Sequence, residues 1–321
     1  MGKTEPHMMM AKQAFILGAG LGTRLRPLTE ELPKPLVPVA NRPLVTFAMD
    51  HLIGDLNTES FLINTHHCPE KYDVAFPEKS YRERNITLRH EPVLLDTAGG
   101  LDNIRDWLPT DDSFVVYNGD ILTDLPLQPA WEHHLESGNL VTLILRSNGD
   151  ELRVGFDPEN GKIVDMRGVL QPDWPHRYQF TGIWFASPEF MRFVRPGKIE
   201  SVVLCFLEAI KAGEKIGGFV EDRGAWSDLG ERESYLDAAK LVQGDFARAV
   251  EGLISPAAEV DPGAKIDEIS SIGPGARIGP GCEIVACSIW ENATVGEGSK
   301  LERCVVRNGQ TVKGEYRGRD F

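Results

Sequence analysis

The sequence predicts two regions of different fold class, an α/β layer fold over residues 1–250 and a solenoid over residues 251–321. Strand-like and helix-like segments alternate through the first region, which is typical of a sheet with helices on its faces. A glycine-rich turn, with Gly18, Gly20 and Gly22, follows the first apolar strand. Beyond residue 251, apolar residues recur every six positions between Pro and Gly corners, which indicates stacked repeats.

Apolar runs and their periodicities place the elements of the α/β region in chain order. The expected strands are 15–17, 61–64, 86–89, 114–117, 140–145, 162–166, 179–185 and 216–220. The expected helices are 43–54, 201–211 with Ser201 as N-cap, and 231–242. Together these elements predict a Rossmann-like, mixed but mostly parallel sheet between helices.

The period-six pattern of the second region is carried by Ile254, Val260, Ile266, Ile272, Ile278 and Ile284. After a five-residue step it continues with Ile289, Val295 and Leu301, and after a second five-residue step with Val306 and Val312. The pattern resembles the left-handed parallel β-helix built from hexapeptide repeats. That resemblance implies that each apolar residue points inward and that three hexapeptides make one coil.

Composition limits the classes of partner. The 34 Lys and Arg against 48 Asp and Glu give a formal net charge of −14, so we expect no nucleic-acid or membrane partner, and cations that bind phosphate must be local. The five cysteines form no C-x-x-C pair, which argues against a disulfide framework or a zinc knuckle. No segment approaches the roughly 20 apolar residues of a membrane span. We therefore expect a cytoplasmic protein without an export signal or anchor.

The stretch 15–38, FILGAGLGTRLRPLTEELPKPLVP, indicates a phosphate cradle beside fixed cations. Glycines let main-chain N–H groups face an anion closely, and Arg24 and Lys34 add positive charge. A lone G-x-G-x-x-R also fits an ordinary strand and turn. The stretch lacks the G-K-[ST] of a P-loop, and it differs from a dinucleotide-binding unit because an Arg, prolines and a second cation follow the glycines.

The whole stretch resembles the signature G-x-G-T-R-L-x-P-L-T followed by P-K-P, which marks sugar-1-phosphate nucleotidylyltransferases, also called NDP-sugar pyrophosphorylases. The resemblance implies an enzyme that makes an NDP-sugar and pyrophosphate from an NTP and a sugar-1-phosphate. It implies catalytic roles for Arg24 and Lys34. It also implies that the nucleotide is bound by Leu17, Gly18, Ala19, Gly20, Gly22 and Thr23.

Two aspartates, in N-G-D and W-x-D-x-G contexts, match the carboxylates that hold Mg2+ in this family. They are Asp120 and Asp228. Either residue alone is more typical of a cap or a turn. Hard oxygen ligands of this kind suit Mg2+, which keeps waters and shares phosphate oxygens. Mg2+ is therefore the expected cofactor.

Further motifs resemble the nucleoside and sugar sides of the family site. The segment 91–101, EPVLLDTAGGL, is similar to L-G-T-A-G and implies nucleoside contacts from Asp96, Thr97 and Ala98, with Asp96 in place of the usual Gly. As an alternative, Thr97 is simply the N-cap of a helix. Asn64, in LINTHH, matches a further position near the nucleotide.

On the sugar side, F-T-G-I at 180–183 implies contacts from Thr181 and Gly182, and Gly155 matches a second glycine. A strand with a bulge at Gly explains both motifs equally well. The E-K-P lysine of many relatives, which grips the sugar phosphate, is missing. Either Arg167 or Lys162 takes its place.

Parts of the sequence also fit two other functions. A hexapeptide acyltransferase needs a histidine base, and none of the eight histidines lies in the solenoid. We therefore expect the solenoid to pack on the catalytic domain or to assemble a homo-oligomer.

A non-catalytic sugar-nucleotide-binding subunit is disfavoured because both cations and both aspartates are present. The motifs fit two choices of nucleobase and sugar. One is a mannose-1-phosphate guanylyltransferase, and the other is a uridylyltransferase that acts on N-acetylmuramate-1-phosphate or another sugar-1-phosphate.

Overall fold

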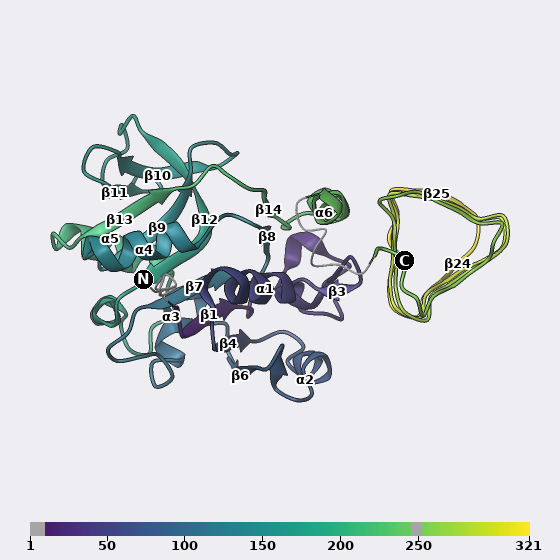
Figure 1. Ribbon diagram of the computed structural model, residues 1–321, viewed down its shortest axis with the longest axis horizontal. Helices are drawn as coiled ribbons and strands as arrows, with labels where there is room; N and C mark the ends of the chain where they lie inside the picture. Colours follow the sequence, from purple (N-terminus) through teal and green to yellow (C-terminus); the bar gives the residue numbers. More distant parts are fainter. Residues whose placement is uncertain (1–9, 245–251) are drawn as a thin grey trace, which may run out of the picture. The chain divides into compact units, whose positions relative to one another are not determined.

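The computed structural model describes residues 10–244 and 252–321, which belong to two compact units (Figure 1). Unit 1 is formed from Met1–Gly20, Ala48–Gly119 and Leu125–Trp226, and unit 2 from Leu21–Phe47, Asp120–Asp124 and Ser227–Phe321. The loop with Arg24 and Lys34 thus belongs to the same unit as the solenoid. The predicted domain boundary at residue 250 lies outside the described residues and stays a prediction.

Unit 1 is built on a ten-stranded sheet of order β10-β11-β13-β9-β12-β7-β1-β4-β6-β5. Its strands are β1 (Gln13–Leu17), β4 (Ser60–Thr65), β5 (Ser80–Tyr81), β6 (Arg84–His90), β7 (Phe114–Asn118), β9 (Val141–Arg146), β10 (Leu152–Asp157), β11 (Lys162–Met166), β12 (Arg177–Ala186) and β13 (Ile216–Val220). Each strand expected from the sequence is present, and β5 and β10 are additional.

The sheet is mixed, as expected. Strands β7, β1, β4 and β6 run parallel to one another, as do β9 and β13. The expectation of a mostly parallel sheet is corrected, because β12 pairs antiparallel with β7, β9 and β10, β11 with β10 and β13, and β5 with β6. The connections from β5 to β6 and from β10 to β11 are too short for the helical crossover that a parallel pair requires.

The helices that accompany this sheet are α1 (Val45–Leu56), α2 (Glu70–Ala75), α3 (Asp96–Asn103), α4 (Gln128–Ser137) and α5 (Val202–Lys211). Ser201 caps α5 as expected, because its side chain accepts a hydrogen bond from the Val203 N–H. The core contains Trp184, which packs edge-on against Phe190 and Phe206 with ring centroids 5.6 and 5.1 Å away. None of the helices in the described residues is long and apolar enough to cross a membrane.

Unit 2 begins with the loop 21–44, which carries two 3-10 turns, Thr23–Leu25 and Lys34–Leu36, and the hairpin of β2 (Pro38–Val39) and β3 (Arg42–Pro43). A second two-stranded sheet pairs β8 (Ile121–Thr123) with β14 (Trp226–Asp228), and α6 (Arg232–Gly244) follows. Leu25, Leu236 and Trp290 belong to one apolar cluster, so the loop, α6 and the solenoid share a core.

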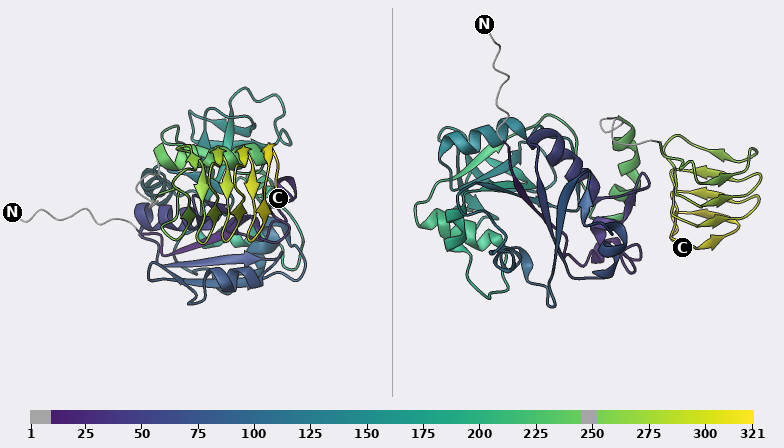
Figure 2. Two further views of the ribbon diagram at one scale, coloured as in Figure 1. Left: turned by 90° about the vertical axis from the view of Figure 1, so that its right-hand side faces the viewer. Right: turned by 60° about the horizontal axis from the view of Figure 1, so that its bottom comes forward.

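The C-terminal region of unit 2 is a three-sided parallel β-helix whose stacked coils are visible in Figure 2. Its sheets are β15-β18-β21-β24, β16-β19-β22-β25 and β17-β20-β23. The strands are β15 (Glu259–Val260), β16 (Lys265–Ile266), β17 (Ser271–Ile272), β18 (Arg277–Ile278), β19 (Glu283–Val285), β20 (Ser288–Ile289), β21 (Thr294–Val295), β22 (Lys300–Glu302), β23 (Val305–Val306), β24 (Thr311–Val312) and β25 (Glu315–Arg317).

The period-six residues stack in register, with Ile278 beside Val295 and Ile284 beside Leu301. Those from Ile272 onward form the buried core of the solenoid, and Val260 and Ile266 are partly buried against it. This geometry is consistent with the expected left-handed parallel β-helix. One position differs. Ile254 is 45% exposed and forms an isolated bridge to Ile272, outside the named strands.

Candidate active site

Four charged side chains predicted from the sequence meet within unit 2. The Lys34 ammonium donates to Asp120 Oδ2 at 2.7 Å and to Asp228 Oδ1 at 3.3 Å. Arg24 Nη2 lies 3.6 Å from Asp228 Oδ2, and Arg24 Nη1 lies 4.0 Å from Glu231 Oε1. Residues from three separate segments of the chain therefore form one cluster of two cations and two predicted metal ligands.

The loop places the two cations by tight local geometry. Gly22 precedes the first 3-10 turn in a left-handed conformation with φ of 59°, which glycine adopts without a steric cost. A Cβ atom at Gly22 would lie 2.9 Å from Thr29 Cγ2 and 3.2 Å from Lys34 Cβ. The Thr29 hydroxyl donates to the Gly22 carbonyl at 2.7 Å. The turn before Arg24 is thus packed directly against Lys34.

The two carboxylates are placed by the pairing of β8 with β14. Asp120 immediately precedes β8 and Asp228 ends β14, and the Leu229 N–H donates to the Asp120 carbonyl at 3.2 Å. The next residue, Gly230, lies against Arg24, because a Cβ atom there would be 2.7 Å from the guanidinium Nη2. Gly230 thus leaves room for the Arg24 guanidinium beside Asp228.

The four charged side chains differ in solvent exposure, and this difference limits the role that each can take. The Lys34 side chain is 8% exposed between carboxylates that are 35% and 40% exposed, whereas the Arg24 side chain is 64% exposed. No group of three or more His, Cys, Asp or Glu in the described part of the chain is arranged to hold a metal. Two carboxylates that converge on one cation still fit Mg2+, which retains waters and takes further oxygens from phosphates.

In unit 1, buried side chains hold the main chain at the start of the glycine-rich turn. The Gly18 N–H donates to Asn64 Oδ1 at 2.7 Å, and the Tyr72 hydroxyl donates to the Gly18 carbonyl at 3.1 Å. Asn64 Nδ2 donates to Glu91 Oε1 at 2.7 Å, and the Leu95 N–H donates to Glu91 Oε2 at 3.1 Å. One network therefore joins the end of β1 to the segment before α3.

This network changes the interpretation of Asn64, which was predicted to bind the nucleotide. Both ends of its amide are occupied within the protein and it is 3% exposed, so it acts on the Gly18 main chain. Glu91 and Tyr72 were not predicted as site residues, and both are fully buried. The one available signal was the position of Glu91, an acidic residue directly after β6 at the start of the EPVLLDTAGGL segment.

Among the other predicted nucleotide-binding residues, Gly20 and Thr23 are exposed, Leu17 and Gly22 are partly buried, and Gly18 and Ala19 are buried. Their roles stay predictions. The main chain changes unit within this turn, after Gly20.

The segment with Asp96, Thr97 and Ala98 forms the start of α3. Asp96 has a φ of 60°, a left-handed conformation natural for the glycine that usually stands here and tolerated by Asp. The alternative of Thr97 as N-cap is wrong, because α3 starts at Asp96 and the Thr97 hydroxyl instead accepts from the Val202 N–H at 2.7 Å. The Ala98 N–H donates to the Glu200 carbonyl at 2.9 Å. Glu200 and Val202, at the start of α5, thus hold this segment.

On the sugar side, Thr181 and Gly182 lie in an irregular part of β12, where the register with β9 shifts. The Thr181 hydroxyl is buried and donates to the Ile144 carbonyl at 2.8 Å. Gly182 has a φ of 83° and packs against Asn118. The register of β10 also shifts at Gly155. The bulges expected from the glycines are therefore present, and sugar contacts stay a prediction.

The two candidates for the missing lysine lie at opposite ends of β11. Lys162 begins the strand and pairs with Asp157, whereas Arg167 follows it and donates its N–H to the Arg153 carbonyl at 2.7 Å. Leu152, next to Arg153, pairs with Gln179 of β12, two residues before Thr181. The strand register therefore places Arg167, rather than Lys162, on the side of Thr181.

The turn that carries Arg167 is organised by Asp165, a carboxylate with no exposed surface. It accepts from the main-chain N–H groups of Gly168 and Leu170, both at 2.7 Å, and from Arg177 Nη1 at 3.0 Å. Burial acts to raise the pKa of Asp165, but these hydrogen bonds together hold it below its ordinary value. The carboxylate stays ionised and fixes the backbone on which Arg167 stands.

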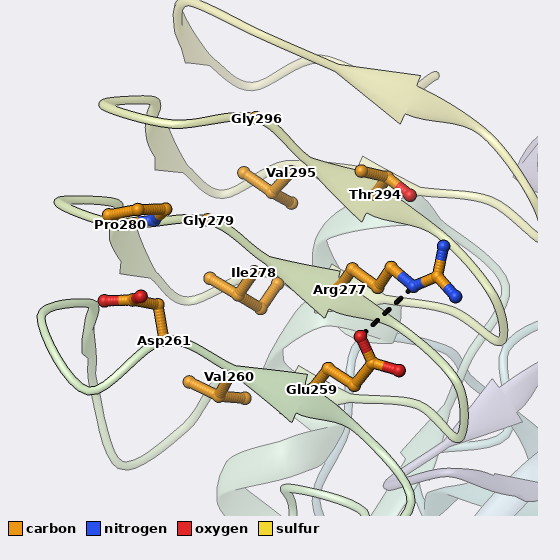
Figure 3. A pocket seen from close by; sticks show the side chains of 10 residues that line it. All are labelled: Glu259, Val260, Asp261, Arg277, Ile278, Gly279, Pro280, Thr294, Val295 and Gly296. Carbon is orange, nitrogen blue, oxygen red and sulfur yellow. Dashed lines mark ion pairs between the residues drawn. The ribbon is translucent and has the colours of Figure 1, made fainter.

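The β-helix carries a shallow groove over β15, β18 and β21 (Figure 3). Val260, Ile278 and Val295 lie along it, and Arg277 Nε is 3.3 Å from Glu259 Oε2. The sequence has no histidine from residue 252 onward. The groove therefore lacks the base that acyl transfer by a hexapeptide enzyme needs.

A mixed α/β unit, a glycine-rich turn and a cluster of paired cations and carboxylates are together typical of the class of nucleotidyltransferases. Residues 13–244 match the Nucleotidyl transferase family model, and residues 250–317 match the GMPPB C-terminal domain. The chain belongs to the nucleotidyl transferase family, and within it to the enzymes that act on sugar-1-phosphates.

Relatives with curated names agree with this class. The mannose-1-phosphate guanylyltransferase catalytic subunit beta of Danio rerio is 30% identical over 314 residues, which cover 92% of this chain and 85% of the relative. The UTP--glucose-1-phosphate uridylyltransferase of Synechocystis is 28% identical over 264 residues, which cover 77% of this chain and 67% of the relative. The similarity to the first relative includes the C-terminal region.

The fold is also similar to that of a Bacillus anthracis protein crystallised in complex with a sucrose. The TM-score is 0.63 at 21% identity, and the match covers 72% of this chain and 95% of the other. This likeness supports the α/β fold class predicted from the sequence.

Proposed function

We propose that this protein is a Mg2+-dependent mannose-1-phosphate guanylyltransferase, which makes GDP-mannose and pyrophosphate from GTP and mannose-1-phosphate. The observation that carries the chemistry is the convergence of Lys34 on Asp120 and Asp228, with Arg24 beside them. The choice of substrates is supported by the Danio rerio relative, whose similarity extends over both regions of the chain. Uridylyl transfer is the second candidate, supported by the Synechocystis relative.

In the proposed reaction, a phosphate oxygen of the sugar-1-phosphate attacks the α-phosphorus of the NTP in line. One P–O bond forms, the bond between the α- and β-phosphates breaks, and pyrophosphate leaves with the electron pair. No general base is needed, because a phosphate monoester is already anionic near neutral pH. The protein therefore has to position two polyanions and neutralise their charge.

Each member of the cluster has a role in this scheme. Lys34, compact and largely buried, holds the α-phosphate and the incoming phosphate at one point. Arg24, exposed and planar, binds the outer phosphates and the departing pyrophosphate. Asp120 and Asp228 would hold Mg2+, which when bound supplies Lewis-acid polarisation of the phosphates. In the absence of phosphates, the two carboxylates balance the charge of Lys34.

The test of substrate is pyrophosphate release across ATP, CTP, GTP, UTP and dTTP, each paired with glucose-, mannose-, N-acetylglucosamine- and N-acetylmuramate-1-phosphate. We expect GTP with mannose-1-phosphate to give the highest kcat/KM, and omission of Mg2+ to abolish release. Fastest release with UTP would establish the second candidate instead. No release with any pair would support the non-catalytic subunit.

The test of the site is Arg24→Ala. Because Arg24 is exposed, we expect the variant to fold with an unchanged Tm and to lose roughly 10²- to 10³-fold in kcat. Arg26→Ala is the matched control, since it removes the same charge from the same exposed loop without touching Asp228. Near-normal turnover by folded Arg24→Ala would overturn the assignment.

A further inference from the structure

Arg307 of the C-terminal β-helix contacts the loop that carries Arg24. Arg307, which follows β23, donates from Nη1 to the Pro27 carbonyl at 3.3 Å, and the same atom lies 3.6 Å from Glu30 Oε2. Its Nε donates to the main-chain oxygen of Phe321 at 2.9 Å, and its side chain is only 18% exposed. The guanidinium is thus fixed within the solenoid and bound to main chain three residues beyond Arg24.

The same end of the β-helix holds the segment after Asp228. Arg232, at the start of α6, donates from Nε to both carboxylate oxygens of Asp320, at 2.9 and 3.0 Å. Arg303 forms ion pairs with Glu233 and Asp237 on the first turns of α6. Polar contacts from adjacent coils therefore reach both chain segments that meet at the Arg24 and Asp228 pair.

Apolar packing joins the same chain segments as these polar contacts. Leu25, the neighbour of Arg24, is 2% exposed and belongs to the same buried cluster as Val305, which lies two residues before Arg307. Tyr235 of α6 donates its hydroxyl to the Pro38 carbonyl at 2.7 Å and accepts from Trp290 Nε1 at 2.9 Å. The loop and α6 are thus packed against the β-helix as well as against each other.

We propose that Arg307 is a positioning residue for nucleotidyl transfer and that the β-helix thereby sets the geometry of the catalytic cluster. This proposal rests on the proposed function, because it assigns Arg24 a role in turnover. A guanidinium bound to the Pro27 carbonyl and to Glu30 restrains the turn that follows Arg24. Loss of that restraint lets Arg24 depart from the geometry needed at the triphosphate, and small displacements of this kind lower kcat strongly.

The first experiment compares Arg307→Met with Arg317→Met in the full chain. Arg317, on β25, is exposed and pairs with Glu302 Oε1 of the solenoid at 3.1 Å, so it is the matched control for charge and location. We expect Arg307→Met to lower kcat about tenfold with little change in the KM for either substrate. Arg317→Met should keep the wild-type kcat. Equal kcat values for Arg307→Met and wild type would overturn the proposal.

A double-mutant cycle separates positioning from general loss of structure. If Arg307 acts through Arg24, Arg307→Met should lower kcat about tenfold in the wild-type background and have almost no effect in the Arg24→Ala background. An equal tenfold loss in both backgrounds would overturn the positioning role while leaving the proposed function intact. Full activity of Arg24→Ala alone would instead overturn the assignment of Arg24, and the positioning role with it.

Two milder variants keep the proposal testable if Arg307→Met fails to fold. Arg307→Lys retains the charge beside Glu30 but loses the planar fork that joins the Pro27 and Phe321 oxygens, so kcat should lie between those of Met and Arg. Glu30→Gln removes the ion pair from the side of the loop and should lower kcat by about two- to threefold in the wild-type background only. A wild-type kcat for both variants would count against the proposal.

Discussion

The charged cluster of unit 2 and the buried network of unit 1 use polar side chains in opposite ways. In the cluster, the side chains themselves are available to a ligand, since Arg24 is 64% exposed and both aspartates are more than a third exposed. In the network, Asn64 is 3% exposed and Glu91 is fully buried, and both act on main-chain groups. The difference implies that the cluster controls turnover, whereas the network controls the conformation and stability of the main chain that it contacts.

The strongest test of this division is Lys34→Met. Methionine keeps the length of the side chain but removes the ammonium that bridges Asp120 and Asp228. We expect kcat to fall about 10³-fold, the range seen when a preorganised electrostatic contact to a transition state is removed. The Tm should also fall slightly, because two carboxylates are left facing each other without their counter-charge. Steady-state kinetics with a thermal melt measures both effects.

Lys12→Met is the control for this experiment. Lys12 pairs with Asp112 at 2.7 Å on an exposed part of unit 1, and such surface pairs contribute little. Its loss should leave kcat unchanged. A Lys34→Met enzyme with nearly normal kcat would contradict the division between the two regions.

The comparison also explains what the sequence could predict. Arg24, Lys34, Asp120 and Asp228 stand in short motifs whose spacing is visible locally, and the structure brings them together as expected. The period of the β-helix is likewise local, and its residues from Ile272 onward form the buried core of the solenoid. Features of this kind need no knowledge of contacts between distant segments.

The network could not be predicted in the same way. The Gly18 and Asn64 contact joins residues 46 positions apart, and the role of Glu91 depends on both. Helix α4 was missed because its sequence, QPAWEHHLES, carries only a weak apolar stripe. The antiparallel direction of β12 depends on the strands that lie beside it in the sheet. Long-range packing decided each of these features, and no spacing within the sequence encodes it.

Acid should weaken unit 1 through a buried histidine. His134 contacts Thr142 Oγ1 at 2.9 Å and Ser113 Oγ at 3.1 Å, and burial, with a smaller effect of His133, lowers its pKa to about 4. The unfolded chain binds a proton near the ordinary histidine pKa of about 6.5, so stability is full above that pH and is lost as the pH falls towards 4. We expect a loss of about 2 kcal/mol in the free energy of unfolding between pH 7.5 and 5.0.

Urea unfolding of the wild type and of His134→Gln at the two pH values measures this contribution. The variant should be less stable at pH 7.5, yet its stability should depend less on pH, because the group that titrates only in the unfolded chain has been removed. If wild type and variant lose the same free energy between pH 7.5 and 5.0, the buried histidine is not the cause.

The smallest expected effect is that of Glu91→Gln, and it tests the network directly. The two oxygens of Glu91 each accept from a donor, Asn64 Nδ2 and the Leu95 N–H, so the amide of Gln must turn its own N–H groups towards one of them. One buried donor then loses its partner, which costs about 1.5 kcal/mol of stability. Because Glu91 acts on main chain rather than on substrate, kcat should stay within about twofold of wild type while the KM for the NTP rises a few-fold.

Glu78→Gln, at an exposed position, should change neither kcat nor the KM for the NTP. A fall in kcat comparable to that of Lys34→Met, with an unchanged KM, would mean that the network takes part in the transition state and that exposure does not separate the two roles.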